Sequence, residues 1–146
     1  MAVLERGDFS TIKLLDAVTL TADFADNESD EVKLSPFVQM EFEIHYTMDA
    51  TETNNSAVLK VLLSDDRDVW VELGIRQDAS PSGGVVEGSL HKLRFVVAGN
   101  AGVEEVREYA LPTTKKYMKI QAMEKGLASA GGVFSTLVRL SLNANL

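Results

Sequence analysis

Hydrophobic and polar residues alternate along most of the 146-residue chain. The clearest run is Phe37–Met48, in which every second residue from Val38 onward is apolar. Because successive side chains of a β-strand point to opposite faces, this run predicts a strand with one face in a core. The other face meets water or a partner. The period stays near two rather than 3.6 throughout, so the sequence predicts an all-β protein.

The same alternation predicts further strands, which are separated by polar or glycine-containing turns. Ala57–Leu63 is apolar nearly throughout, as expected for a central strand that is buried on both faces. Lys125–Gly132 contains three glycines and predicts a hairpin between the last two strands, and Ala98–Gly102 predicts a hairpin-like turn. Gln77–Gly88 is the longest predicted loop and a place for contact with a neighbour. The remaining predicted strands are Val18–Phe24, Val69–Ile75, Leu90–Val97, Val103–Leu111, Met118–Ala122 and Val133–Leu142.

About eight strands at these spacings predict an antiparallel two-sheet β-sandwich of the jelly-roll type. Residues 12–146 form one predicted domain, and Met1–Thr11 is predicted to be an N-terminal arm that docks on a neighbour or frays. The predicted core comprises Val38, Met40, Phe42, Ile44, Leu59, Val61, Val71, Leu73, Ile120, Phe134, Val138 and Leu140.

Composition narrows the function classes. The net charge of −8 repels phosphate backbones, so nucleic acid is not an expected partner. No run approaches the roughly 18 apolar residues of a spanning helix, and the N-terminus does not resemble a signal peptide, so no membrane association is expected. The chain has no cysteine, which excludes disulfides and thiolate metal sites. Stability must therefore come from packing, hydrogen bonding and association.

Little in the sequence supplies catalysis. His45 falls on the polar face of its predicted strand and His91 opens another, and neither stands at metal-ligand spacing from a second histidine. Asp65–Asp68 and Asp23–Glu31 each gather carboxylates of the kind that bind calcium, but neither matches an EF-hand loop. Solvated turns are the favoured interpretation of both. We expect no enzyme activity, no cofactor and no required metal.

Four residues are candidates for an interface. The register that buries Val69, Val71 and Leu73 places Trp70 on the opposite face, where it either covers the back of a sheet or anchors a partner. Lys115 and Lys116 form the only adjacent basic pair, in a loop, and are predicted to be exposed charges that meet an acidic patch. Phe9 is a large apolar residue in the predicted arm.

Four segments follow one another along the chain: Leu14–Thr21, Ser56–Val71, Glu108–Met123, which contains a proline-marked loop, and Val133–Leu142, which follows a small-residue turn. Together they resemble the Bbp16-like capsid cement (decoration) proteins of tailed phages. The chain departs from the family pattern at the acidic segment Asp26–Glu31. The resemblance consists of alternation, turn residues and their order, and it extends over most of the chain.

The resemblance implies a non-enzymatic β-sandwich that binds the outside of a phage head and bridges capsomers. The implied partners are the major capsid protein and copies of the chain itself, in a virion made in the host cytoplasm. Two alternatives stay open. One is a tail or head-completion structural protein, and the other is a carbohydrate-binding jelly-roll module, for which the sequence offers only one tryptophan and three tyrosines.

Overall fold

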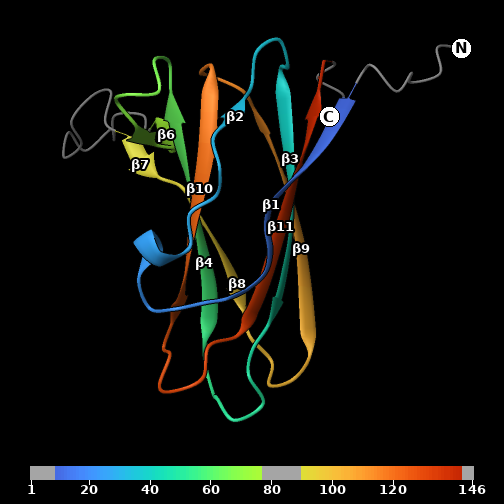
Figure 1. The fold of residues 1–146 in the computed structure, drawn as a ribbon, viewed down its shortest axis with the longest axis vertical. Helices are drawn as coiled ribbons and strands as arrows, with labels where there is room; N and C mark the ends of the chain where they lie inside the picture. The colour runs from blue at the N-terminus through green and yellow to red at the C-terminus, as the bar shows by residue number, and fades with distance from the viewer. Residues whose placement is uncertain (1–8, 77–89, 143–146) are drawn as a thin grey trace, which may run out of the picture.

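The computed structural model describes residues 9–76 and 90–142, which form antiparallel strands packed in two main sheets (Figure 1). These residues contain no α-helix, only a single turn of 3-10 helix, η2 (Phe24–Asp26). The all-β prediction is therefore confirmed. The strands are β1 (Phe9–Thr19), β2 (Val32–Lys33), β3 (Gln39–Thr47), β4 (Ser56–Ser64), β5 (Val71–Glu72), β6 (Gly74–Arg76), β7 (Leu90–Lys92), β8 (Arg94–Ala98), β9 (Glu104–Pro112), β10 (Tyr117–Lys125) and β11 (Val133–Ser141).

The strand order is that of a jelly roll. Sheet A has the order β1-β11-β3-β9, and sheet B has the order β2-β10-β4, with β5 and β8 both paired to β4. The short strands β6 and β7 pair with each other. When β5, β6 and β7 are set aside, the other eight strands numbered along the chain read 1-8-3-6 in sheet A and 2-7-4-5 in sheet B. Two interleaved Greek keys give this order, so the predicted architecture is confirmed.

Both predicted hairpins are wrong. β10 lies in sheet B and β11 in sheet A, so Lys125–Gly132 crosses from one sheet to the other. Ala98–Gly102 likewise carries the chain from β8 in sheet B to β9 in sheet A. Each of these two connections contains a glycine where the backbone is crowded. A Cβ on Gly132 would lie 2.7 Å from the carbonyl oxygen of Thr47, and one on Gly99 would lie 2.8 Å from the Cβ of Met48. Turn composition marks the reversal but does not say which sheet receives the next strand.

The core lies between the inner faces of the two sheets. Ten of the twelve predicted core residues are buried. The exceptions are Val38 and Val71, which are 43% and 44% exposed. Val38 lies just before β3 begins, in the connection from β2, ahead of the strand whose alternate residues are buried in the core. Val71 lies in the two-residue edge strand β5, which has a neighbour on one side only, so it is not covered.

Other element boundaries also differ from the prediction. The first strand ends at Thr19, and Phe24 begins η2, whose N-cap Asp23 accepts a hydrogen bond from the backbone N–H of Ala25. The predicted strands Val69–Ile75 and Leu90–Val97 are each split in two. β1 begins at Phe9, so part of the expected arm pairs with β11, and the rest of that arm and the loop Gln77–Gly88 lie outside the described residues.

The two ends of the sandwich carry different loops (Figure 1). The upper end in the figure holds the connections from β2 to β3, from β4 to β5 and from β9 to β10. The lower end holds the connections from β3 to β4, from β8 to β9 and from β10 to β11. None of the elements in the described residues is a helix long and apolar enough to cross a membrane.

Candidate interaction surface

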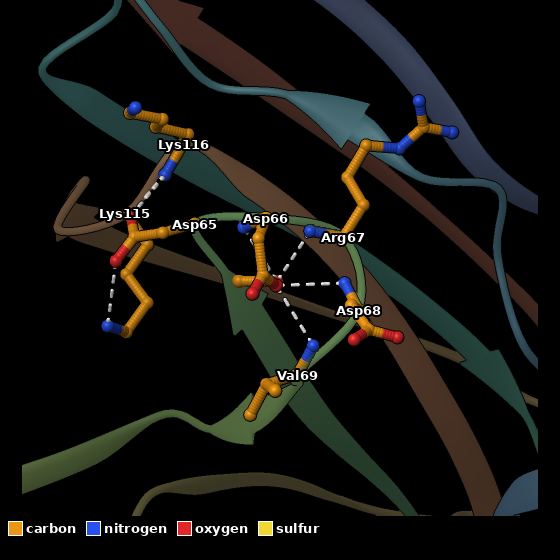
Figure 2. Close-up of polar contacts among 8 residues, drawn as sticks. Asp65, Asp66, Arg67, Asp68, Val69, Lys115 and Lys116 are labelled. Carbon is orange, nitrogen blue, oxygen red and sulfur yellow. Dashed lines mark hydrogen bonds and ion pairs between the residues drawn. The ribbon is translucent and has the colours of Figure 1, made fainter.

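The Asp-rich segment predicted as a turn forms the β4–β5 connection at the upper end (Figure 2). One carboxylate oxygen of Asp66, Oδ1, lies 3.0 Å from the hydroxyl of Ser64 and accepts the backbone N–H groups of Asp68 and Val69, each at 2.9 Å. The N–H of Val69, followed by that of Asp68, lowers the pKa of Asp66. These hydrogen bonds from the backbone to the Asp66 carboxylate hold the turn in its conformation. Residues 9–76 and 90–142 contain no group of three or more acidic or histidine side chains arranged to hold a metal ion.

The lysine pair is attached to this turn. The ammonium nitrogen of Lys115 lies 3.2 Å from Oδ2 of Asp65, and the backbone N–H of Lys116 donates to Oδ1 of the same carboxylate at 3.3 Å. The Lys116 side chain is exposed and points away from Asp65 (Figure 2). The two lysines therefore differ: Lys115 ties the β9–β10 loop to the turn, whereas Lys116 offers its charge to solvent or a partner.

Trp70 is half-buried on the outer face of sheet B. The ammonium nitrogen of Lys119 lies 4.5 Å from the centroid of its ring, and the same nitrogen lies 3.3 Å from Oε1 of Glu28. Lys119 points outward because its neighbours along β10, Met118 and Ile120, are buried in the core. The predicted outward orientation of Trp70 fits this contact, which holds the ring in place.

Two further aromatic rings on this face carry cations. The guanidinium of Arg67 lies 5.6 Å from the ring of Tyr117 and 2.6 Å from a carboxylate oxygen of Glu31. Phe24 contacts two cations, with Lys60 4.5 Å and Arg94 5.1 Å from its ring centroid. On the outer face of sheet B, the basic side chains named here therefore contact carboxylates or aromatic rings of the same chain.

Exposed apolar side chains flank Trp70. Val69 is 64% exposed, against the expectation that it would be buried with Val71, because it lies in the turn before β5 begins. Both valines line a hollow of about 170 Å³ together with Asp65, Asp66 and Lys115. We call this region the turn surface, which consists of Arg67, Val69, Trp70, Val71, Lys115 and Lys116.

The turn surface unites three of the four candidate interface residues. Tryptophan and arginine are the residue types most enriched at energetically important contacts. Phe9 lies apart, at the start of β1 in sheet A, where its backbone pairs with Ser141. Sequence reasoning missed Arg67, Val69 and Val71, because the period-two pattern assigned the valines to the core. The Asp-rich turn directly before Val69 was the available signal, because a valine that follows a turn need not yet be covered by a second sheet.

A buried polar network at the lower end was also missed. Glu124 is fully buried, accepts the N–H of Gly132 at 2.8 Å and accepts the hydroxyl of Tyr46. The side-chain amide of Asn55 donates to Glu124 at 3.2 Å and to Glu52 at 3.0 Å. Burial, followed by the bond to Glu124, raises the pKa of Tyr46. Alternation could not identify this cluster because Glu124 occupies an inward position, where an apolar residue is expected.

The network fastens two sheet-crossing loops together. Glu52, in the β3–β4 loop, is 3% exposed and accepts the N–H of Ala128 at 2.7 Å and the N–H of Ser129. The N–H of Ala128, followed by the amide of Asn55, lowers the pKa of Glu52. These hydrogen bonds between the two loops stabilise this end of the sandwich internally.

The two histidines occupy different sheets. His45 lies half-exposed on the outer face of sheet A, as its position on the polar side of the alternation predicted. His91 lies in β7, where its backbone pairs with Ile75.

Comparison with known proteins identifies a fold but no family. No family model and no curated protein matches the chain. Among solved structures, the SPBc2 prophage-derived protein YomS aligns with 92% of this chain and 94% of its own, at 14% identity and a TM-score of 0.51. A structure described under Bacillus endospore appendages that form disulfide-linked pili covers 98% of each chain at 12% identity. Its TM-score of 0.39 is too low to indicate a shared fold.

Proposed function

We propose that the protein is a non-enzymatic structural component of a tailed-phage particle, and specifically a cement protein that binds the outside of the head. The observation that carries the proposal is a jelly roll that presents a tryptophan, an arginine and two exposed valines close together at one end. The resemblance of its segments to Bbp16-like cement proteins supports this function. The similar fold of YomS, a prophage-derived protein, also supports a role in a phage particle.

In the proposed mechanism the turn surface contacts the major capsid protein. Val69 and Val71 lose water on contact, and Trp70 supplies a rigid ring that Lys119 already holds in position. Lys116 provides an exposed positive charge for an acidic patch on the shell. Each contact contributes modest binding energy, but many copies around a symmetric shell together raise the cost of its rupture.

The acidic chain is expected to meet copies of itself at symmetry axes as a small homo-oligomer. The net charge of −8 keeps such a protein apart from nucleic acid and in solution before assembly. A tail or head-completion component would use the same sandwich and the same end surface, so location on the particle is the property that separates the two structural alternatives.

The carbohydrate-binding alternative has less support. Sugar recognition by a jelly roll requires aromatic rings that face solvent, and each aromatic side chain described in residues 10–76 and 93–142 is buried or half-buried. Trp70, Tyr117 and Phe24 carry cations on their rings. A sugar would have to displace these cations before it could stack.

The direct test adds purified protein to phage heads that lack it. Cryo-electron microscopy should show density at a fixed number of sites on the head, and bound protein should raise the temperature of DNA release, because a ligand that prefers the intact shell stabilises it. Density confined to the tail would favour the tail component. Absence of density on any particle, combined with specific binding to a glycan array, would favour the sugar-binding module.

A matched pair of variants tests the proposed surface. Val69→Asp places a charge on the turn surface, and Val103→Asp makes the same change at a valine that is 48% exposed at the opposite end of the sandwich. Only Val69→Asp should abolish head binding. Trp70→Ala should weaken binding by about 2 kcal/mol or more, roughly thirtyfold. Equal binding by both valine variants would show that the interface does not include the turn surface.

A further inference from the structure

His45 joins two strands of sheet A through both nitrogens of its ring. From the outer face of β3, its Nε2 lies 2.6 Å from Oε1 of Glu43 on the same strand. Its Nδ1 lies 3.3 Å from Oε1 of Glu104, the first residue of β9. The contact with Glu104 therefore links an interior strand of the sheet to the strand at its edge.

The chemistry of these contacts requires a protonated ring. An ionised carboxylate offers only acceptors, and a neutral imidazole carries one N–H, so it can satisfy one of the two glutamates. The imidazolium carries two N–H groups and satisfies both. Loss of the proton would place a nitrogen lone pair against a carboxylate oxygen. The Glu104 contact is the one expected to open, because it is the longer and its side chain is 59% exposed.

We propose that His45 is a proton-dependent clamp that fastens the lower half of the edge strand β9 to β3. β9 pairs with β3 on one side only, and none of its residues is fully buried. Its upper half has a separate anchor, since the ring of Tyr109 stacks on Phe95 of sheet B with 4.2 Å between centroids. The clamp therefore acts where the strand has fewer other contacts.

The surrounding charges favour the protonated state. On β9, Glu108 lies directly opposite Glu43, which adds negative charge near the ring. On β1, Lys13 and Asp16 share a hollow of about 220 Å³ with His45 and pair with each other at 3.5 Å. On β11, Ser135 lies opposite the ring. A further charged pair on this face joins Arg139 of β11 to Glu41 of β3, at 3.5 Å.

The direction of the pH effect follows from the ring's affinity for its proton. The hydrogen bond with Glu43, then that with Glu104, raises the pKa of His45 above its ordinary value of 6.5. A group whose pKa rises on folding stabilises the fold fully below the unfolded value. The clamp is thus complete below about pH 6.5 and opens as the pH rises through the higher folded pKa.

The first test is an NMR titration of the His45 ring in the full chain. His91→Gln assigns the signals, because these are the only two histidines. The wild-type His45 should titrate above 6.5, and Glu104→Gln should shift its pKa downward. A wild-type pKa at or below 6.5, or no shift in the Glu104→Gln variant, would overturn the proposal without any need for a variant of His45 itself.

The second test measures backbone hydrogen exchange along β9 from pH 5.5 to 9, corrected for intrinsic rates. Exposed ion pairs contribute little to stability, so protection near Glu104–Val106 should fall by roughly 1.4- to fivefold as the pH rises. The amides near Tyr109 serve as an internal control and should change less. His45→Gln should remove the pH dependence. The same dependence in His45→Gln, or a uniform change along β9, would show that His45 is not a clamp.

Discussion

The hydroxyl of Tyr46 in sheet A donates a hydrogen bond to the carboxylate of Glu124 in sheet B. Both side chains are fully buried, so this bond joins the two layers of the sandwich inside the core. Glu124 also accepts the N–H of Gly132 and the amide of Asn55. A buried carboxylate is tolerated when donors surround it, so these partners explain how a glutamate can occupy a core position.

Removal of the Tyr46 hydroxyl should therefore destabilise the protein. Tyr46→Phe leaves the buried Glu124 one donor short, and hydrogen bonds to charged groups contribute about 1.5 to 3 kcal/mol. The free energy of unfolding from urea denaturation should fall by that amount. Tyr109→Phe is the matched control, because it keeps the ring stacked on Phe95 and should cost less. Equal losses for the two variants would mean that the hydroxyl of Tyr46 is not essential to the network.

Phe134 and Val71 test the core directly. Phe134 is fully buried and lies between Tyr46 of β3 and Val18 of β1 in sheet A. Phe134→Ala should cost roughly 3 to 5 kcal/mol of unfolding free energy. Val71→Ala removes an apolar side chain that is 44% exposed and should change stability by less than about 1 kcal/mol. A large loss at Val71 together with a small one at Phe134 would contradict the burial pattern.

The alternation in the sequence correctly predicted which residues of the long strands are buried, but it failed at strand ends and at sheet edges. In Phe37–Met48 the alternation correctly predicted burial of Phe42, Ile44 and Tyr46, because sheet B covers this part of the strand. It failed at Val38 and Val71, where a strand ends or lies at an edge. Alternation records which side a residue faces but not whether another sheet covers it.

Sheet membership and the buried network were beyond a local pattern. The glycines of Lys125–Gly132 mark a reversal in any topology, and only the packing of the whole chain sends β11 to the other sheet. Glu52 and Glu124 are 72 positions apart in the sequence, and Asn55 donates a hydrogen bond to each of them. Of the candidate surface, Trp70 and the lysines could be named from residue type, whereas Val69 was assigned to the core.

Crowding at the sheet crossing provides another prediction. A Cβ on Gly132 would lie 2.7 Å from both the carbonyl oxygen of Thr47 and a ring carbon of Tyr46. Gly132→Ala should therefore force the backbone to shift and cost about 1 to 3 kcal/mol in thermal or urea unfolding. Gly102→Asn is the control, because its φ of +71° suits asparagine and the space around it is more open. A stable Gly132→Ala variant would mean that the crossing is looser than described.

Acid should weaken the lower end of the sandwich through Glu52. The N–H of Ala128 and the amide of Asn55 hold the pKa of Glu52 below its ordinary value of 4.5 in the folded state. A carboxylate whose pKa is lowered on folding stabilises the fold above the unfolded value, and this contribution is lost as the pH falls through the folded pKa. Glu52→Gln removes the contribution at every pH.

The difference in unfolding free energy between wild type and Glu52→Gln should therefore be large at pH 7 and shrink toward pH 3. Urea denaturation of both proteins at the two pH values measures this change. Glu108→Gln, on the exposed outer face of sheet A, controls for the loss of one negative charge. Asp66 also has a lowered pKa, so the wild-type curve alone contains several contributions, and only the difference between variants isolates Glu52. A difference that does not change with pH would mean that Glu52 is held by packing rather than by its charge.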